Sequence, residues 1–432
     1  MKQLFSGGIH PADGKRLTVD SPFKKVTPPE SVTILLRQHI GAPCSPLVKE
    51  GDRVCIGQKI GDGTGMCVPV HASVSGVVTR IGSAPHPGGG EVAAITIQND
   101  FKDTELTLTP CADPDALNAE ELLCIIREAG IVGMGGATFP TDVKARGAVG
   151  AIDTLLINAC ECEPYITADD ALLRAFPKQM LQGVKLLQQS LKPKEVVVAI
   201  EDNKPVAAEA LNKYLPEFPQ LRLQLLPTRY PQGAEKQLVL AVTGRQVPPG
   251  KLPGAVGCAV FNAHTVFAIW QAVYERRPLT RRIVSVTGEA VAQPQNFVVP
   301  IGTSFAHLLS AAGGLKEEAV LMLAGGPMMG VAQLSSEVPT VKGTGAVLCL
   351  PVRKKAEHPT CIRCGKCVSV CPMHLQPLYL DAAWLKKDAA ALDRLHLADC
   401  MECGCCSYSC PGELPLVERF RTAKRAIKEG QI

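Results

Sequence analysis

The chain has 432 residues, and we expect it to fold into several domains rather than one. Its formal net charge of +4 comes from interspersed charges and its aromatic content is 4%, which together exclude a strong polyanion-binding surface, so we expect no nucleic-acid partner. The sequence shows neither the apolar core of a signal peptide near its start nor an apolar run long enough for a transmembrane helix.

Residues 1–110 are rich in Gly, Pro and Val and predict short strands separated by glycine turns. The stretch "PLVKEGDRVCIGQKIGDGTG" resembles the flattened β-sandwich of lipoyl and biotinyl carrier domains. Those domains present a modified lysine, but Ile60–Arg80 contains no lysine. We therefore expect the sandwich without the swinging arm, and we expect Cys67 to be a half-buried cysteine on one of its strands.

Residues 118–278 alternate helical and strand patterns, which favours an α/β domain. The segment "NAEELLCIIREAG" predicts a helix with Asn118 as its N-cap and Gly130 at its end. The runs "DTLLIN" and "EVVVAI" predict buried parallel strands, with helical spacing between them.

Residues 280–345 predict strand, turn, strand and a helix capped by Thr303 or Ser304 and ended by Gly313. This order resembles the β-grasp of soluble-ligand-binding domains. Because the segment holds no cluster of charged or metal-ligating residues, we expect a spacing or docking role rather than a ligand site.

Residues 352–432 carry half of the chain's 18 cysteines, with a helix expected between two cysteine runs and a basic helix at the end. The runs "CIRCGKCVSVCP" and "CMECGCCSYSCP" each follow the C-x2-C-x2-C-x3-C-P pattern of bacterial ferredoxins. Three thiolates at this spacing wrap one cubane, while the fourth cysteine reaches the neighbouring cluster. We therefore expect two [4Fe–4S] clusters, one held by Cys361, Cys364, Cys367 and Cys410, the other by Cys400, Cys403, Cys406 and Cys371.

Zinc is the alternative metal for these cysteines. Structural zinc sites commonly use two separated C-x2-C pairs, and two complete ferredoxin runs do not fit that pattern. Cys405 does not occupy a cysteine position of the ferredoxin pattern, so we expect it to bind no metal itself.

Two loops in the α/β region suggest a cofactor site. "GIVGMGGATFPTDVK" leads into a helix and is typical of loops whose backbone N–H groups approach a phosphate. "LLINACECEPYITADD" ends a predicted strand, and ligands bind at the carboxyl ends of parallel strands. Each loop taken alone is also compatible with an ordinary polar turn.

Together these loops resemble the flavin- and NADH-binding subunit of respiratory complex I. With "GGIHP", "YPQGAEKQL", "FNAHTVFAI", "LAGGPMMG" and the cysteine runs, the whole chain resembles the C subunit of the Rnf electron-transport complex, an ion-translocating ferredoxin:NAD oxidoreductase. The resemblance implies a multidomain α+β fold: a carrier-like β-sandwich, an α/β flavin domain, a β-grasp domain and a helical two-cluster domain. It also implies FMN, two [4Fe–4S] clusters and NAD(H) as substrate.

By the same resemblance, a cofactor-binding set and two positioning residues are expected. Glu163 and Glu235 would border the flavin and the nicotinamide. FMN would be held or bordered by Gly133, Gly135, Gly136, Phe139, Lys144, Asn158, Glu161, Tyr230, Gly233, Asn262 and Thr265. Thr138 departs from the family loop, which commonly has a glycine there.

The resemblance further implies a peripheral subunit on the cytoplasmic face of the cell membrane. Its partners would be the other subunits of a membrane-bound complex, including a ferredoxin-like subunit. Two other functions stay open at this point: a flavin/iron–sulfur cobalamin reductase, and a non-catalytic electron wire whose flavin site is lost through Thr138.

Overall fold

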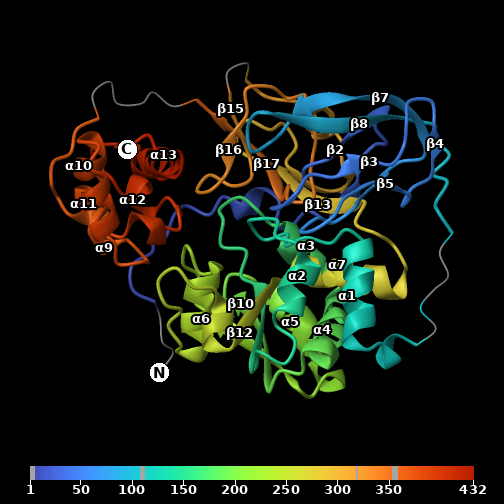
Figure 1. Cartoon of the computed structure of the whole chain (residues 1–432), viewed down its shortest axis with the longest axis horizontal. Helices are drawn as coiled ribbons and strands as arrows, with labels where there is room; N and C mark the ends of the chain where they lie inside the picture. The colour runs from blue at the N-terminus through green and yellow to red at the C-terminus, as the bar shows by residue number, and fades with distance from the viewer. Residues whose placement is uncertain (1–4, 108–110, 112, 318–319, 353–358) are drawn as a thin grey trace.

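The computed structural model describes residues 5–107, 111, 113–317, 320–352 and 359–432. The ends of the expected ranges 1–110 and 352–432 therefore lie partly outside the described residues. Four bodies are visible in Figure 1: a β-sandwich, an α/β domain below it, a mixed sheet between them and a small helical body at one end. None of the helices in the described part of the chain is long and apolar enough to cross a membrane.

The β-sandwich packs two small antiparallel sheets. One has the order β2 (Ser31–Leu35), β8 (Glu91–Asn99), β7 (Gly76–Pro85), β4 (Arg53–Val54), and the other the order β3 (Ser45–Pro46), β5 (Lys59–Asp62), β6 (Val70–His71). Alternating residues such as Ile34, Ile60 and Ile95 are fully buried between the sheets. Cys67 does not lie on a strand and is not half-buried: it sits in the β5–β6 connection with 3% exposure, so that prediction was wrong. The chain turns there at two glycines, Gly63 and Gly65, which end the strand before Cys67 is reached.

The α/β domain is built on a parallel sheet, as the apolar runs predict. Its order is β11 (Leu221–Leu226), β10 (Glu195–Glu201), β9 (Thr154–Ala159), β12 (Cys258–Asn262), and every neighbouring pair is parallel. Alternating β9 residues face opposite sides: Leu155 and Ile157 pack in the larger core, while Leu156 packs with Leu238 of α6 (Glu235–Thr243). Burial on both faces explains why the strands read as continuous apolar runs.

Helices cover this sheet on both sides. On the face opposite α6 lie α3 (Ala168–Ala175), α4 (Pro177–Leu191), α5 (Pro205–Tyr214) and α7 (Ala263–Tyr274). Two further helices, α1 (Ala119–Glu128) and α2 (Thr141–Arg146), flank the glycine-rich loop. Asn118 caps α1 as predicted, and the cap is reciprocal, because the Glu121 carboxylate accepts a hydrogen bond from the Asn118 N–H.

The mixed sheet has the order β1 (Lys24–Lys25), β14 (Gln295–Pro300), β13 (Arg281–Thr287), β17 (Ala346–Pro351), β15 (Val320–Ala324), β16 (Val331–Ala332). Its helix α8 (Phe305–Ala311) is capped by Ser304, one of the two caps that the sequence predicts. The sheet extends beyond the predicted range 280–345, because it also contains β17, which follows that range, and β1 from the N-terminal segment.

The helical body contains α9 (Lys366–Ser369), α10 (Pro377–Leu385), α11 (Ala389–Arg394), α12 (Cys405–Tyr408) and α13 (Leu416–Lys428). The single helix expected between the cysteine runs is divided into α10 and α11, with Lys387 in a left-handed conformation between them. The apolar face of α13, including Leu416 and Phe420, is buried against this body.

The N-terminal segment joins the α/β domain to the helical body. Ile9 exchanges backbone hydrogen bonds with Tyr230, and the Gly8 N–H donates to the carbonyl of Val370. A Cβ on Gly7 would lie 2.6 Å from the carbonyl oxygen of Cys371, which explains the glycine. Figure 1 shows this dark blue segment passing between the two bodies.

The contact between α4 and α7 fixes the far side of the α/β domain and gives a stability prediction. A Cβ on Gly183 would lie 2.5 Å from the Val266 carbonyl oxygen, so Gly183→Ala must push the helices apart. We expect it to lower the free energy of unfolding by about 1–3 kcal/mol in a denaturant titration. Gly254→Ala is the matched control, because nothing lies within 4 Å of a Cβ there. Equal stability of the two variants would contradict the tight contact.

Candidate functional site

The eight cysteines that match the ferredoxin spacing line two cavities in the helical body. Cys361, Cys364, Cys367 and Cys410 line one, and Cys371, Cys400, Cys403 and Cys406 line the other. Each cavity thus takes three cysteines from one run and the fourth from the other run. Gly365 and Gly404 adopt left-handed conformations, which turn each run tightly before α9 and α12. Four thiols around one space are the donor set that a [4Fe–4S] cluster requires.

The two cavities differ in their surroundings. Cys361 and Cys364 are exposed, and their neighbour Ile362 is 66% exposed. Cys403 and Cys406 are buried, in the cavity that faces the α/β domain. Burial raises the pKa of the Cys400 thiol to about 11 when no metal is bound. Coordination to iron would remove this proton, because a metal-bound thiol is deprotonated.

Cys405 also lines the second cavity. It is fully buried. The nearby Cys405 side chain lowers the pKa of the Cys403 thiol below its ordinary value, against the effect of burial. In the other run, the position of Cys405 is occupied by the exposed Lys366, so the two cysteine loops are not equivalent.

The α/β domain meets the second cavity through Tyr230. This side chain is 2% exposed, and its hydroxyl donates a 2.7 Å hydrogen bond to the carbonyl oxygen of Cys403. Burial raises the pKa of Tyr230 above its ordinary range, so the hydroxyl keeps its proton and acts as a donor. Tyr230 therefore links a predicted flavin-site segment directly to a cysteine loop.

Glu163 makes a second connection at this junction. Its carboxylate accepts hydrogen bonds from the N–H groups of Met328 (3.2 Å) and Met329 (2.8 Å) in the "LAGGPMMG" segment. A Cβ on Gly326 would overlap this carboxylate, and a Cβ on Gly404 would lie 3.0 Å from the Met328 carbonyl. Glu163 thus orders the loop that packs against the second cysteine run.

The glycine-rich loop is held against the start of α7. The Met134 N–H donates to Thr265 Oγ1 at 2.9 Å, and a Cβ on Gly135 would lie 3.0 Å from Asn262 Cβ. Asn262 itself caps α7, its Oδ1 accepting from the N–H groups of His264 and Thr265. Gly135 and Gly136 are exposed, and a Cβ on Gly136 would meet open space. A bare backbone beside a helix N-terminus suits a phosphate.

The remaining predicted residues form pairs around this loop. The Asn158 amide at the end of β9 donates to the Gly233 carbonyl at 2.7 Å. Lys144 on α2 forms an ion pair with Glu235 at the start of α6. The Phe139 carbonyl accepts from the Gly133 N–H at 2.8 Å, so Phe139 helps to close the loop through its backbone. The ligand-facing roles of these residues stay predictions.

Glu161 faces the N-terminus of α3 rather than the glycine loop. Its carboxylate accepts from the N–H groups of Asp169 (2.7 Å) and Asp170 (3.2 Å). Burial raises the pKa of Glu161 to about 8. Asp169 in turn accepts from the Asn262 amide at 2.6 Å, which connects Glu161 to the glycine loop through one intermediate residue.

Sequence reasoning missed two buried cations that support these loops. Lys15 donates to the carbonyls of Glu161, Glu163 and Ile166 at 2.9, 3.0 and 2.5 Å. Arg282, at the start of β13, donates to the carbonyls of Met134 and Lys342 at 3.4 and 2.6 Å. Burial lowers the pKa of Arg282 to about 10, so it carries its charge beneath the glycine loop at neutral pH. The only sequence signal for Lys15 is its place at the end of "GGIHPADGK".

Comparison with known families agrees with each domain. The Nuo51 FMN-binding domain matches residues 126–271, and the RnfC barrel sandwich hybrid domain matches residues 3–102. The SLBB domain matches residues 283–332, and the 4Fe-4S dicluster domain matches residues 360–413. An FMN-binding domain joined to a dicluster domain defines a flavin-linked iron–sulfur electron-transfer protein.

Relatives of the whole chain narrow this class. The C subunit of the Na(+)-translocating ferredoxin:NAD(+) oxidoreductase complex of Acetobacterium woodii is 42% identical over 87% of this chain and 86% of its own length. The proton-translocating counterpart of Clostridium ljungdahlii is 43% identical over 88% and 84%. The C subunit of the ion-translocating oxidoreductase complex of Serratia proteamaculans is 40% identical over 98% of this chain and 61% of its own length. The chain belongs to the family of C subunits of ion-translocating ferredoxin:NAD oxidoreductase complexes.

A solved structure shares part of the fold. A chain of an NAD+-reducing [NiFe]-hydrogenase in the H2-reduced state aligns over 75% of this chain and 65% of its own length, with a TM-score of 0.50 and 20% identity. At this identity the likeness concerns the fold alone.

The buried carboxylate of Glu163 predicts a pH dependence. Burial raises the pKa of Glu163 from 4.5 to about 7, although the two backbone hydrogen bonds oppose the shift. Between these values the folded protein holds a proton that the unfolded chain has released, so the stability contributed by Glu163 is full below pH 4.5 and is lost as the pH rises through 7. We expect Glu163→Gln to remove this loss, in unfolding titrations from pH 5 to pH 8. Parallel stability curves for the wild type and the variant would contradict the prediction.

Proposed function

We propose that this chain is the peripheral NAD(H)-facing subunit of a membrane-bound, ion-translocating ferredoxin:NAD oxidoreductase, and that it moves electrons between NAD(H), FMN and two [4Fe–4S] clusters. The observation that carries this proposal is the direct contact between the flavin domain and one of the two cysteine-lined cavities. Two relatives that are named as such subunits support it, because this chain aligns with most of the length of each.

The FMN site we propose lies at the glycine loop. Gly133, Gly135 and Gly136 would leave the backbone open to the phosphate, and the N-terminus of α7 with Asn262 and Thr265 would face it. Arg282 below the loop and Lys144 on α2 supply positive charge, which favours an anion. Asn158, Glu161, Phe139 and Gly233 would border the ring system, and Glu163, Tyr230 and Glu235 the ring and the nicotinamide.

The chemistry divides between cofactors and protein. Bound FMN takes two electrons together from NADH and releases them singly, while cubane clusters carry one electron each. The protein's own residues position these groups. Tyr230 and Glu163 keep the flavin domain against the second cysteine run, and Lys15 fixes the backbone of the loop that carries Glu163. No residue is required as a general acid or base.

We propose that Cys400, Cys403, Cys406 and Cys371 hold the cluster nearer to the flavin, and that Cys361, Cys364, Cys367 and Cys410 hold the outer one. Two contacts support this order: the Tyr230–Cys403 hydrogen bond and the packing of Gly404 on the Glu163-bound loop. The exposure of Cys361 and Cys364 supports the outer cluster as the exit point toward a partner.

The partner we propose is a ferredoxin-like subunit of the same complex, with the chain seated on the cytoplasmic face of the membrane. Around the outer cavity, exposed Ile362 is flanked by Arg363 and Lys366. An apolar side chain among cations suits an acidic electron-transfer partner.

A cofactor count tests the proposal. The protein, purified anaerobically, should contain eight iron atoms and one FMN per chain, and should reduce an artificial one-electron acceptor with NADH. Eight iron atoms without bound or restorable FMN would overturn the proposed enzyme activity. The non-catalytic electron wire would then be the remaining function. Reduction of a cobalamin in preference to a ferredoxin would favour the cobalamin reductase instead.

The register of the second cysteine run predicts different outcomes for adjacent residues. Cys406→Ser removes a proposed ligand, and we expect the iron content to fall by about half, as measured by metal analysis of the anaerobic protein. Cys405→Ser keeps a hydrogen-bond donor beside Cys403 and should leave the iron content unchanged. The reverse pattern would overturn the ligand assignment of both clusters.

A further inference from the structure

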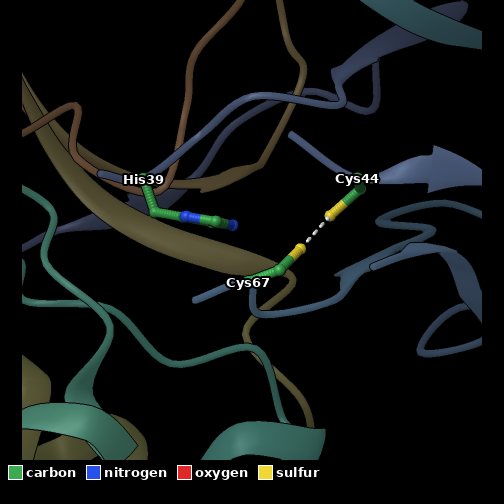
Figure 2. Close-up of side chains that lie close together, drawn as sticks. All are labelled: His39, Cys44 and Cys67. Atoms are coloured by element: carbon green, nitrogen blue, oxygen red, sulfur yellow. Dashed lines mark hydrogen bonds between the residues drawn. The ribbon is translucent and has the colours of Figure 1, made fainter. Parts of the chain in front are cut away.

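Three metal-ligating side chains lie together in the β-sandwich, far along the chain from the ferredoxin runs. They are His39, Cys44 and Cys67, and each is buried, with exposures of 5%, 5% and 3%. One ligand atom from each lies within 4.8 Å of the other two. Figure 2 shows the imidazole of His39 directed toward the two sulfurs, which are 3.5 Å apart.

The hydrogen bonds of His39 prepare one ring nitrogen for a metal. Nδ1 lies 3.1 Å from the carbonyl oxygen of Ile40, which fits a proton on Nδ1. Nε2 then carries the lone pair, and it accepts the Val68 N–H at 3.2 Å. Metal-binding histidines commonly donate from one nitrogen to a backbone carbonyl and coordinate through the other, so a cation at Nε2 would take the place of the Val68 N–H.

A fourth donor atom is close by. The Val68 carbonyl oxygen lies 3.3 Å from Cys44 Sγ and 4.0 Å from Cys67 Sγ. With the two sulfurs and the imidazole nitrogen, this oxygen makes up a set of four donors, which is the number that a tetrahedral cation needs.

The two loops that carry these donors are fixed by the fold. The Ala42 N–H donates to the Met66 carbonyl at 3.0 Å, and the Cys44 N–H donates to the Leu36 carbonyl at 2.8 Å. A Cβ on Gly41 would lie 2.1 Å from the Met66 oxygen, so only glycine permits this approach. The donor atoms are therefore held near one another before any cation arrives.

We propose that His39, Cys44 and Cys67 form a structural zinc site, with the Val68 carbonyl in the fourth position. Binding releases the two thiol protons to solvent and leaves His39 neutral. Coordination replaces the contact of Cys44 Sγ with the Val68 oxygen, and it also replaces the hydrogen bond from the Val68 N–H to His39 Nε2. Two thiolates cancel the charge of Zn²⁺. The site would therefore add no net positive charge near the buried ammonium of Lys342, which interacts electrostatically with both cysteines.

The proposed zinc site lies where the β-sandwich contacts the glycine loop of the α/β domain. The Ile40 N–H, next to His39, donates to the carbonyl of Thr138 in the glycine loop at 3.3 Å. Lys342 Nζ donates at 2.6 Å to the carbonyls of both Pro69 and Gly130, near Cys67 and at the start of that loop. A cation that joins the His39 and Cys67 segments would thus brace the sandwich where it meets the flavin domain.

The test uses the holoprotein with both clusters loaded, so that the eight ferredoxin cysteines are occupied. After incubation with zinc and removal of excess metal on a chelating resin, we expect one zinc per chain beside eight iron atoms. Zinc-edge X-ray absorption should show two sulfur neighbours at about 2.3 Å and nitrogen or oxygen neighbours at about 2.0–2.1 Å. Four sulfur neighbours would mean zinc in a ferredoxin run and would overturn the site.

Variants separate this site from other cysteines. Cys44→Ser and Cys67→Ser should each lose most of the zinc while iron and FMN stay unchanged, and Cys55→Ser, a half-buried cysteine of the same domain, should keep it. If the variants do not fold, the absorption spectrum of the wild type still decides. Zinc below one-tenth per chain in the wild type, or a Cys44–Cys67 disulfide found by peptide mapping of the native protein, would overturn the proposal.

Discussion

The limited reach of a short cysteine run governs the helical body. A run at spacing three can wrap three sulfurs around one space, and its fourth cysteine points away. Cys371 and Cys410 therefore belong to the cavity of the other run, and neither cavity is complete until both runs are folded. Because each proposed cluster would need residues from both halves, the two should assemble together.

The same body is tied to the flavin domain by few but well-defined contacts. Tyr230 donates to Cys403, and Glu163 orders the loop that packs on Gly404. Lys15 holds the backbone around Glu163 from the other side. Contacts through backbone atoms restrict the separation between a flavin and its nearest cluster, on which electron transfer depends, more tightly than contacts between flexible side chains would.

Periodicity and spacing made much of this fold predictable. The parallel strands at β9 and β10, the Asn118 cap and the Ser304 cap follow from local patterns, and all are present. The grouping of the eight cysteines into two crossed sets also matches the spacing. Lys15 and Arg282 could not be predicted, because their partners are backbone carbonyls from distant segments. Cys67 was misjudged because strand patterns do not reveal where a strand ends at a glycine turn. Glu161 was expected at the flavin, and only the structure shows that its carboxylate caps α3.

The N-terminal segment makes completion of the fold a long-range event. Residues near Ile9 pair with Tyr230 of the α/β domain, and the Gly8 N–H reaches Val370 of the helical body. Lys24 and Lys25 likewise pair with β14 of the mixed sheet. Because these partners lie far away along the sequence and in three different bodies, the segment can settle only after those bodies have formed, and such long-range closure is slow. Ordering of the first cysteine run would then also complete the pairing of the N-terminal segment.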